Sequence, residues 1–356
     1  MKNFSRADFF LQLSDLPQPD RRREEETARG WSKMAGLEGP AGLLETVHTR
    51  LSGLLADQGD LDLTRRALFL FASDHALLEE GGLTSAEPAP LAKTLEELAA
   101  GKHPVSRLAS LTGTRLVTVN LGIPGLDPET PGILHLPVED QGTSNMLKQE
   151  AMTEEAMMTA IRLGMELASQ TRASGLDLLL ADSVPQGADF DLAALLSVLF
   201  GRTPEDLLER GPDLPDSLFQ RRAGILAQAL EEHSINPHNT LDLLRQLGSL
   251  ELAGLTGLMA GAALYCLPVL LGSTASLTAA LILTRLLPQS RSIFFAGHQV
   301  TDPGGQMALR ELGLVPLADH VMPGPGAGGA LYLLPMLDLV CQVYKGQAKA
   351  GQKEDL

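Results

Sequence analysis

The sequence predicts an α/β protein built on a doubly wound parallel sheet. Short apolar runs with the length of buried strands alternate with segments whose apolar residues recur at helical spacing, as in repeated βα units. Gly 35 and Pro 22 together make 57 of 356 residues, which suits many tight βα turns better than a plain helical bundle. With 44% apolar residues the chain can bury a large core. We therefore expect a Rossmann-like fold.

Both ends of the chain are predicted to be helical. Asp20 can cap a helix that opens with opposite charges three and four residues apart, and residues 42–55 carry one apolar stripe. The tail is helical from about residue 334. We expect a small helical domain drawn from both chain ends beside one α/β domain, with boundaries at residues 1–65, 335–356 and 66–334.

Six strands and four clear helices are expected inside the α/β domain. The strands are the apolar runs at residues 67–72, 114–120, 176–181, 269–271, 292–296 and 314–318. The helices are the segments with helical spacing at residues 152–170, 188–200, 217–232 and 304–312. Ligands of a doubly wound sheet bind at the carboxyl ends of its strands, so residues that follow these runs are candidate site residues.

Charge and cysteine usage exclude several classes of protein. The chain carries 28 basic and 44 acidic residues, and a net charge of −16 repels phosphate backbones, which disfavours nucleic acid as a partner. Cys266 and Cys341 show no metal-ligand or redox spacing, which indicates a reduced, cytoplasmic protein without disulfides. No apolar segment near the N-terminus has the pattern of a secretory signal.

One apolar segment is long enough to raise the question of a membrane span. Residues 252–284 carry no charged side chain over 33 positions. Several glycines and Pro268 interrupt the segment, and its pattern changes on either side of Pro268. The pattern favours a helix, a buried parallel strand and a second helix, so we expect no membrane contact.

A glycine-rich string, PGPGAGGA, occupies residues 323–330 after the last expected strand. Its Gly324, Gly326 and Gly329 match G-x-G-x-x-G, and glycines at a helix start let the backbone approach an anion closely. However, the 27 residues after Gly329 contain no second strand to carry a ribose-binding acid, which disfavours a dinucleotide site. A phosphate-binding loop and a turn without a ligand both stay open.

Three pairs of Asp and His residues follow expected strands. They are Asp74 with His75, His298 with Asp302, and Asp319 with His320. Each pair could place a base beside its orienting partner, and Asp74 with His75 could equally form a plain turn. No third ligand stands at metal-binding spacing, so neither a metal nor another cofactor is expected.

Several motifs, in this order, resemble the nicotinate-nucleotide:dimethylbenzimidazole phosphoribosyltransferase family. FASDHA at 71–76 is similar to its F-A-A-D-H-G segment, and GTSN at 142–145 with EAMT at 150–153 is similar to its G-T-x-N-F and P-A-M-T segment. The residues at 297–304 resemble its S-H-x-S-A-E-P-G-H turn. The resemblance covers about residues 33–342, which is nearly the whole chain.

The resemblance implies a dimeric enzyme that moves phosphoribose from nicotinate mononucleotide to the lower-ligand base of a cobamide, without a metal. In the family, a Glu in a G-E-G-T-G loop removes the acceptor's proton. Here that loop reads GPGAG, and Pro325 stands where the family has Glu, so no catalytic residue is assigned. The family's phosphate loop is also largely altered, at 182–190.

The resemblance also assigns contacts by position. Asp74 and His75 are expected in the acceptor-base pocket. Arg222 falls where the family has a phosphate-contacting Lys. The full set of expected nucleotide and phosphate contacts is Gly187, Arg222, His298, Asp302, Gly304, Gly324, Gly326 and Gly328.

The joint loss of the base and most of the phosphate loop favours a non-catalytic subunit as the first hypothesis. The chain most resembles the degenerate subunit of the two-subunit phenol and p-cresol phosphoribosyltransferase. It would then form a heterodimer with a homologous catalytic subunit acting on a phenolic or benzimidazole acceptor. One alternative is a self-sufficient enzyme whose base has moved to Asp302, Asp74 or the pair of Asp319 and His320. Another is a binding protein that senses a nucleotide without transforming it.

Overall fold

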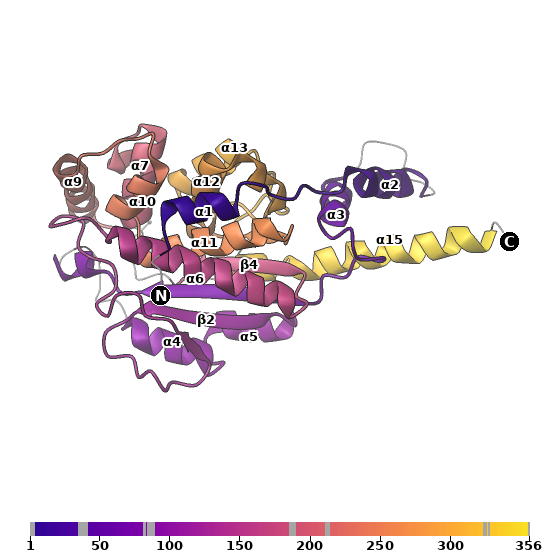
Figure 1. Ribbon diagram of the computed structural model, residues 1–356, viewed down its shortest axis with the longest axis horizontal. Helices are drawn as coiled ribbons and strands as arrows, with labels where there is room; N and C mark the ends of the chain where they lie inside the picture. The colour runs from indigo at the N-terminus through magenta and orange to yellow at the C-terminus, as the bar shows by residue number, and fades with distance from the viewer. Residues whose placement is uncertain are drawn as a thin grey trace.

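The core of the molecule is a parallel sheet with helices on both faces (Figure 1). The computed structural model describes residues 4–34, 42–80, 83, 90–184, 190–210, 214–322, 326 and 328–354. Within these residues six strands pair in the order β3-β2-β1-β4-β5-β6, and every pair is parallel. The strand order reverses between β1 and β4, as it does in doubly wound sheets, so the predicted fold class is confirmed.

The strands are apolar because helices cover both faces of the sheet. All eight residues of β1 are buried, and so are all three residues of β5 and of β6. The strand bounds are β1 Arg66–Ser73, β2 Arg115–Gly122, β3 Ile133–His135, β4 Leu178–Ser183, β5 Val269–Leu271 and β6 Phe294–Ala296.

Two differences from the predicted strands have simple causes. The strand predicted at 314–318 is wrong: Val315 is exposed and Pro316 has no N–H. The segment joins the end of β6 and the residues after it through three backbone bonds, which make one isolated bridge between His298 and Ala318. The short strand β3 was not predicted, because three residues carry too little periodicity to be recognised.

The helices divide between the two faces, with α4 and α5 on one side and α6 and α11 on the other (Figure 1). Two 3₁₀ helices, Ala76–Glu80 and Pro288–Ile293, accompany them. The α-helix bounds are α1 Arg6–Gln12, α2 Arg21–Ser32, α3 Leu43–Leu54, α4 Leu91–Ala99, α5 Pro104–Leu111, α6 Glu154–Ala173, α7 Phe190–Phe200, α8 Pro204–Leu207, α9 Asp216–Glu232, α10 Thr240–Leu247, α11 Leu250–Leu264, α12 Thr274–Leu286, α13 Pro303–Leu312, α14 Gly328–Leu331 and α15 Leu334–Glu354.

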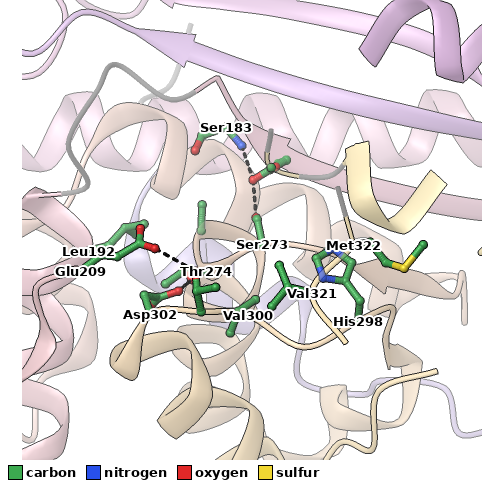
Figure 2. A pocket seen from close by; sticks show the side chains of 15 residues that line it. Ser183, Leu192, Glu209, Ser273, Thr274, His298, Val300, Asp302, Val321 and Met322 are labelled. Atoms are coloured by element: carbon green, nitrogen blue, oxygen red, sulfur yellow. Dashed lines mark hydrogen bonds between the residues drawn. The ribbon is translucent and has the colours of Figure 1, made fainter. Parts of the chain in front are cut away.

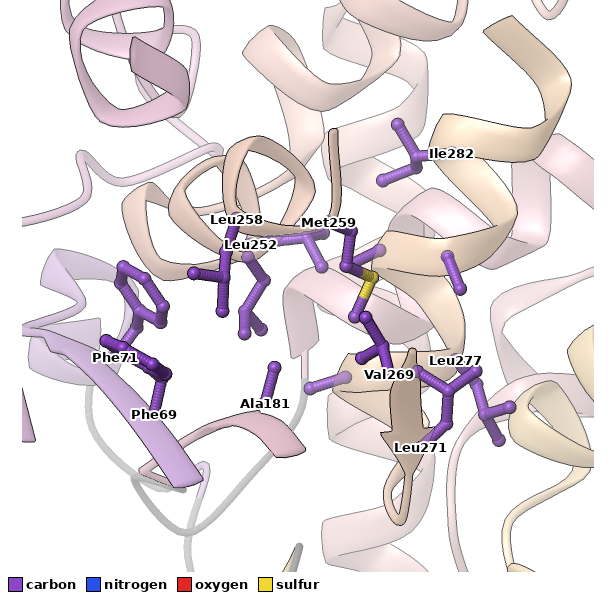
Figure 3. Close-up of a cluster of buried hydrophobic side chains, with 14 of the residues drawn as sticks. Phe69, Phe71, Ala181, Leu252, Leu258, Met259, Val269, Leu271, Leu277 and Ile282 are labelled. Carbon is purple, nitrogen blue, oxygen red and sulfur yellow. The ribbon is translucent and has the colours of Figure 1, made fainter. Parts of the chain in front are cut away.

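The uncharged segment 252–284 forms α11, β5 and α12, as predicted. Figure 3 shows Leu252, Met259 and Val269 of this segment in one apolar cluster with β1. Small residues let α11 lie directly against α6, since a Cβ atom on Gly257 would come within 2.0 Å of the Ile161 carbonyl oxygen. Among the described helices, none is long and apolar enough to cross a bilayer.

Helices from the two chain ends pack together, with α15 against α2 and α3 (Figure 1). Trp31 donates its indole N–H to His48 Nδ1 at 3.2 Å, and the Tyr344 ring of α15 lies 5.1 Å from Trp31. The first helix lies elsewhere: in α1, Arg6 pairs with Glu154 of α6 at 2.6 Å. The domain boundaries at 65 and 335 stay a prediction.

Candidate functional site

A polar pocket lies at the carboxyl ends of β4, β5 and β6 (Figure 2). It has a volume of about 180 Å³, and we call it the β4–β6 pocket. Its polar lining comes from the ends of three strands: Asp182 near the end of β4, Ser273 and Thr274 after β5, and His298 and Asp302 after β6. Gly326 also lines it. This is the edge of the sheet where ligands of doubly wound proteins bind.

The carboxylate of Asp182 is held in a fixed orientation in the pocket wall. Its Oδ1 accepts a hydrogen bond from the backbone N–H of Ser183 at 2.9 Å and another from the Ser273 hydroxyl. Ser273 itself caps α12, accepting from the backbone N–H of Ser276 at 3.1 Å. The start of α12 and the end of β4 are thus joined through one carboxylate, as Figure 2 shows for the two serines.

A glycine is needed opposite Asp182. Gly326 has a φ of +51°, a left-handed conformation that other residues adopt with strain. A Cβ atom at this position would also lie 2.1 Å from Asp182 Oδ2, which is a steric clash. The backbone of Gly326 therefore lies directly beside the second oxygen of this carboxylate.

Asp302 lies on the other side of the pocket and caps α13. Its Oδ1 accepts from the backbone N–H of Gly305 at 2.6 Å, and its Oδ2 accepts from the Thr274 hydroxyl. Burial raises the pKa of this carboxyl above its usual value, although the two hydrogen bonds oppose the shift. Asp302 thereby links the first turns of α12 and α13.

His298 presents a buried nitrogen without a hydrogen-bond partner. Its Nδ1 lies 2.6 Å from the carbonyl oxygen of Gln299, which places the ring proton on Nδ1 and leaves Nε2 as an acceptor. The residue is only 5% exposed, and Nε2 has no partner among the described residues. A Cβ atom on Gly329 would lie 2.2 Å from this nitrogen, so glycine is required there too.

A second polar cluster lies at the end of β1, and we call it the β1 network: Ser73, His75, Thr143, Asp191 and Glu251. His75 Nε2 lies 2.5 Å from Glu251 Oε1, and the Ser73 hydroxyl donates to the other oxygen of Glu251. Burial alone would lower the pKa of His75, but Glu251, with Asp191 and Asp74 nearby, raises it to about 9. The pKa of Asp191 is raised, because burial outweighs the attraction of His75.

Arg222 does not line the β4–β6 pocket. Its Nε donates to the Leu83 carbonyl oxygen at 2.6 Å, and its guanidinium lies 5.7 Å from the centre of the Phe190 ring at the start of α7. Burial lowers the pKa of Arg222. Its assignment as a phosphate contact stays a prediction, as does that of Asp74 and His75 as acceptor contacts.

The structure brings together only some of the predicted site residues. His298, Asp302 and Gly326 share the β4–β6 pocket. Gly304 and Gly328 are buried next to the pocket in α13 and α14 without lining it. Gly187, Gly324 and Pro325 lie outside the described residues.

Asp319 and His320 are exposed, and Asp319 lines a separate cavity of about 540 Å³. Sequence reasoning missed Ser273, Thr274 and Glu209 as pocket residues, and it treated Asp182 only as part of an altered loop. The signal for Ser273 and Thr274 was their place directly after a buried strand. No group of three or more His, Cys, Asp or Glu residues in the described part of the chain is placed to hold a metal ion.

An α/β fold with a polar pocket at the carboxyl ends of its parallel strands is typical of proteins that bind small molecules, enzymes among them. The phosphoribosyltransferase family model matches residues 16–352. Its relatives carry the name nicotinate-nucleotide–dimethylbenzimidazole phosphoribosyltransferase. The chain therefore belongs to that family.

Three known proteins illustrate the similarity. The phosphoribosyltransferase of this name from Geobacter metallireducens is 30% identical over 85% of this chain and 86% of its own length. The one from Pseudomonas putida is 32% identical over 86% of each chain. The crystal structure of the Thermus thermophilus protein superposes with a TM-score of 0.82 at 26% identity, covering 92% of this chain and 96% of the other.

Proposed function

We propose that this chain itself transfers phosphoribose from nicotinate mononucleotide to the lower-ligand base of a cobamide, a phenol or a benzimidazole. The observation that carries the proposal is the β4–β6 pocket, which holds fixed carboxylates, hydroxyls and a histidine acceptor in a chain of this family. The sequence ranked a self-sufficient enzyme second to a supporting subunit. The carboxylates in the pocket reverse that order, because they supply proton acceptors that Pro325 cannot.

The negative charge of the pocket suits the step in which the glycosidic bond breaks. Asp182, Glu209 and Asp302 line it, and none of its described lining residues is Lys or Arg. The stretches 185–189 and 323–327 contain no Lys or Arg in the sequence either. When the bond from C1′ of ribose to the positively charged nicotinate ring breaks, positive charge spreads onto the ribose. Carboxylates beside that carbon stabilise the charge as it develops.

The first turn of α12 offers the contacts for the sugar. The hydroxyl groups of Ser273 and Thr274 line the pocket, and each already donates to a carboxylate. The Ser273 oxygen also accepts from the Ser276 N–H, whereas the hydrogen bond of the Thr274 hydroxyl is the one it donates, so Thr274 is the better acceptor for a ribose hydroxyl. His298 Nε2 is a further acceptor in the same wall.

A supporting subunit of a heterodimer is the second candidate, in which a homologous catalytic chain supplies the missing Glu. Two observations favour it. Pro325 has no titratable group. In addition, Met336, Leu339 and Val343 form an exposed apolar stripe on α15, and the exposed Tyr332 precedes that helix. Exposed apolar stripes of this kind mark protein contacts. A nucleotide sensor is the third reading, and it requires binding without turnover.

Nicotinate release separates these candidates. The purified chain is incubated with nicotinate mononucleotide and a mixture of phenol and dimethylbenzimidazole, alone and then with a homologue that retains the loop Glu. Release by the isolated chain supports the self-sufficient enzyme. If the isolated chain releases no nicotinate, and adding the homologue brings release or changes the choice of acceptor, the result supports the heterodimer instead. Tight binding of the mononucleotide without release in either mixture supports the sensor.

A further inference from the structure

We infer that the β4–β6 pocket recognises the ribose and the positively charged pyridine ring of its donor, and does not recognise the 5′-phosphate. A pyridine riboside, which lacks that phosphate, should therefore bind at least as tightly as the corresponding mononucleotide. The inference deepens the function proposed above and rests on it for the identity of the pyridine and the ribose. The charge of the lining, the caps of two helices, the bonds of the polar side chains and the position of two arginines support it.

The lining of the pocket is acidic. Asp182, Glu209 and Asp302 supply three carboxyl groups, and none of the described lining residues is Lys or Arg. In the sequence at 185–189, which follows the described end of β4, the one charged residue is Asp189. Ionised carboxylates repel a phosphate dianion, and a protonated carboxyl group does not attract it. A pyridinium ring has the opposite charge and is attracted.

Both helices that begin at the pocket are already capped by side chains. A phosphate commonly binds at a helix N-terminus, where backbone N–H groups lack partners within the helix. In α13 the carboxylate of Asp302 already occupies that place, accepting from the Gly305 N–H at 2.6 Å, and Pro303 has no N–H. In α12 the Ser273 hydroxyl accepts from the Ser276 N–H at 3.1 Å. A phosphate at either end would have to compete with these side chains.

The polar side chains of the lining offer acceptors more than donors, whereas a phosphate dianion needs donors. Three of the four hydroxyl side chains in the lining already donate to its three carboxylates: Ser273 to Asp182, Thr274 to Asp302 and Thr301 to Glu209. The fourth hydroxyl belongs to Ser183. The lining therefore suits a ligand that donates hydrogen bonds.

His298 is independent evidence for a ligand that donates. Its Nδ1 lies 2.6 Å from the Gln299 carbonyl oxygen, and its Nε2 has no partner among the described residues although the residue is only 5% exposed. Figure 2 shows its ring among the side chains that line the pocket. A buried acceptor is costly unless a donor reaches it. Ribose hydroxyls, a free 5′-hydroxyl included, are donors, and the phosphate dianion that replaces the 5′-hydroxyl in a mononucleotide is not.

Two arginines that could bind a phosphate lie outside the pocket lining. Arg222, at the position of the family's phosphate-contacting Lys, donates from Nε to the Leu83 carbonyl oxygen at 2.6 Å. Its guanidinium lies 5.7 Å from the centre of the Phe190 ring. Arg310 lines the separate cavity of about 540 Å³. The described wall of the β4–β6 pocket thus contains no counter-ion for a phosphate.

The test is the binding of four ligands to the purified full chain, measured by titration calorimetry: nicotinamide riboside, nicotinate riboside, nicotinamide mononucleotide and nicotinate mononucleotide. Their net charge at neutral pH runs from about one positive charge in the first to about two negative charges in the last. Each riboside should bind about tenfold more tightly than its mononucleotide at low salt, and the difference should shrink as salt is added. Equal affinities would also show that the phosphate is not recognised. A mononucleotide that binds about tenfold more tightly than its riboside would overturn the inference.

Three variants locate the effect. Glu209→Gln keeps an oxygen that accepts from the Thr301 hydroxyl but removes one charge, so it should reduce the preference for ribosides roughly threefold or more. Glu96→Gln, at an exposed position of α4 outside the pocket lining, is the matched control and should leave the preference unchanged. Arg222→Gln should leave the Kd for nicotinate mononucleotide unchanged. A loss of about tenfold in Arg222→Gln would show that the phosphate is bound there and would overturn the inference. Thermal denaturation of each variant monitors folding.

Nicotinate release, with phenol as the acceptor, separates this inference from the proposed function. Binding that favours the ribosides, without release from any ligand, would support the inference about the pocket and refute the proposed transfer. Release from nicotinate mononucleotide, with a riboside that binds far more weakly, would support the transfer and overturn the inference. If none of the four ligands binds, both fail.

Discussion

Two polar clusters lie at the same edge of the same sheet, and they differ in how their side chains are partnered. In the β1 network the charged side chains bond to one another and are enclosed. In the β4–β6 pocket the polar side chains are tied in pairs, but the pairs line an open volume of about 180 Å³. The two clusters therefore differ in kind: an ion pair is bonded within the first, and pairs of hydroxyl and carboxylate groups line the space of the second.

The two strand ends also differ in the segments that lie next to them. The loop at 142–143 lies directly on the end of β1, since the backbone N–H of Thr143 donates to the Asp74 carbonyl oxygen at 2.7 Å. A Cβ atom on Gly142 would lie 2.3 Å from the same oxygen. Glu251, at the start of α11, bonds to the His75 ring. After β5 helix α12 begins within three residues, and after β6 a short loop leads to α13; residues of both helix starts and of that loop line the pocket.

The largest expected effect breaks the enclosed cluster. Glu251→Ala leaves the His75 side chain and the Ser73 hydroxyl buried without their shared partner. Removing one member of a buried ion pair costs about 3–5 kcal/mol, so the free energy of unfolding in urea should fall by that amount. The matched change in the pocket, Thr274→Val, should cost roughly 1 kcal/mol, because it removes one hydrogen bond at a wet surface. Equal losses would contradict the comparison.

The free energy of unfolding of the unaltered chain should also fall at alkaline pH, by somewhat less than in Glu251→Ala. The pKa of His75 is about 9 in the folded protein against an ordinary value of 6.5. A raised pKa stabilises the fold fully below pH 6.5, and the contribution is lost as the pH rises through 9, about 3 kcal/mol in total. The charged groups that face His75 are Glu251, Asp191 and Asp74.

Urea unfolding of the unaltered chain at about pH 6 and about pH 9.5 measures this loss. His75→Gln should flatten the difference between the two conditions, since it removes the titrating group. A variant that keeps the full alkaline loss would show that the loss originates outside the β1 network.

The fold could be predicted from the sequence because strands that are buried on both faces of a sheet are continuous apolar runs. Apolar runs such as β1 and β4, separated by helical spacing, are enough to identify a parallel sheet. The strand expected at 314–318 has the same apolar composition, but its Pro316 and exposed Val315 prevent a full ladder. Apolar composition alone therefore does not predict which residues of such a segment are exposed.

The site was harder to predict because its parts come from separate strands. His298 and Asp302 follow one strand and were recognised, but the partners that fix them in place, Gln299 and Thr274, were not. Asp182 and Gly326 are 144 positions apart, and no spacing rule connects them. Their contact depends on the three-dimensional course of the chain after β6.

The smallest expected effect concerns Asp302, which the sequence offered as a relocated base. Asp302→Ala removes the cap of α13 and should cost about 1 kcal/mol in urea unfolding, whereas Asp302→Asn should cost only a few tenths, because Asn caps a helix as well as Asp does. Turnover of Asp302→Asn should stay close to that of the unaltered chain, since Asp302 holds two helices in place. A large loss of turnover in Asp302→Asn at unchanged stability would instead place the proton acceptor on the α13 side of the pocket.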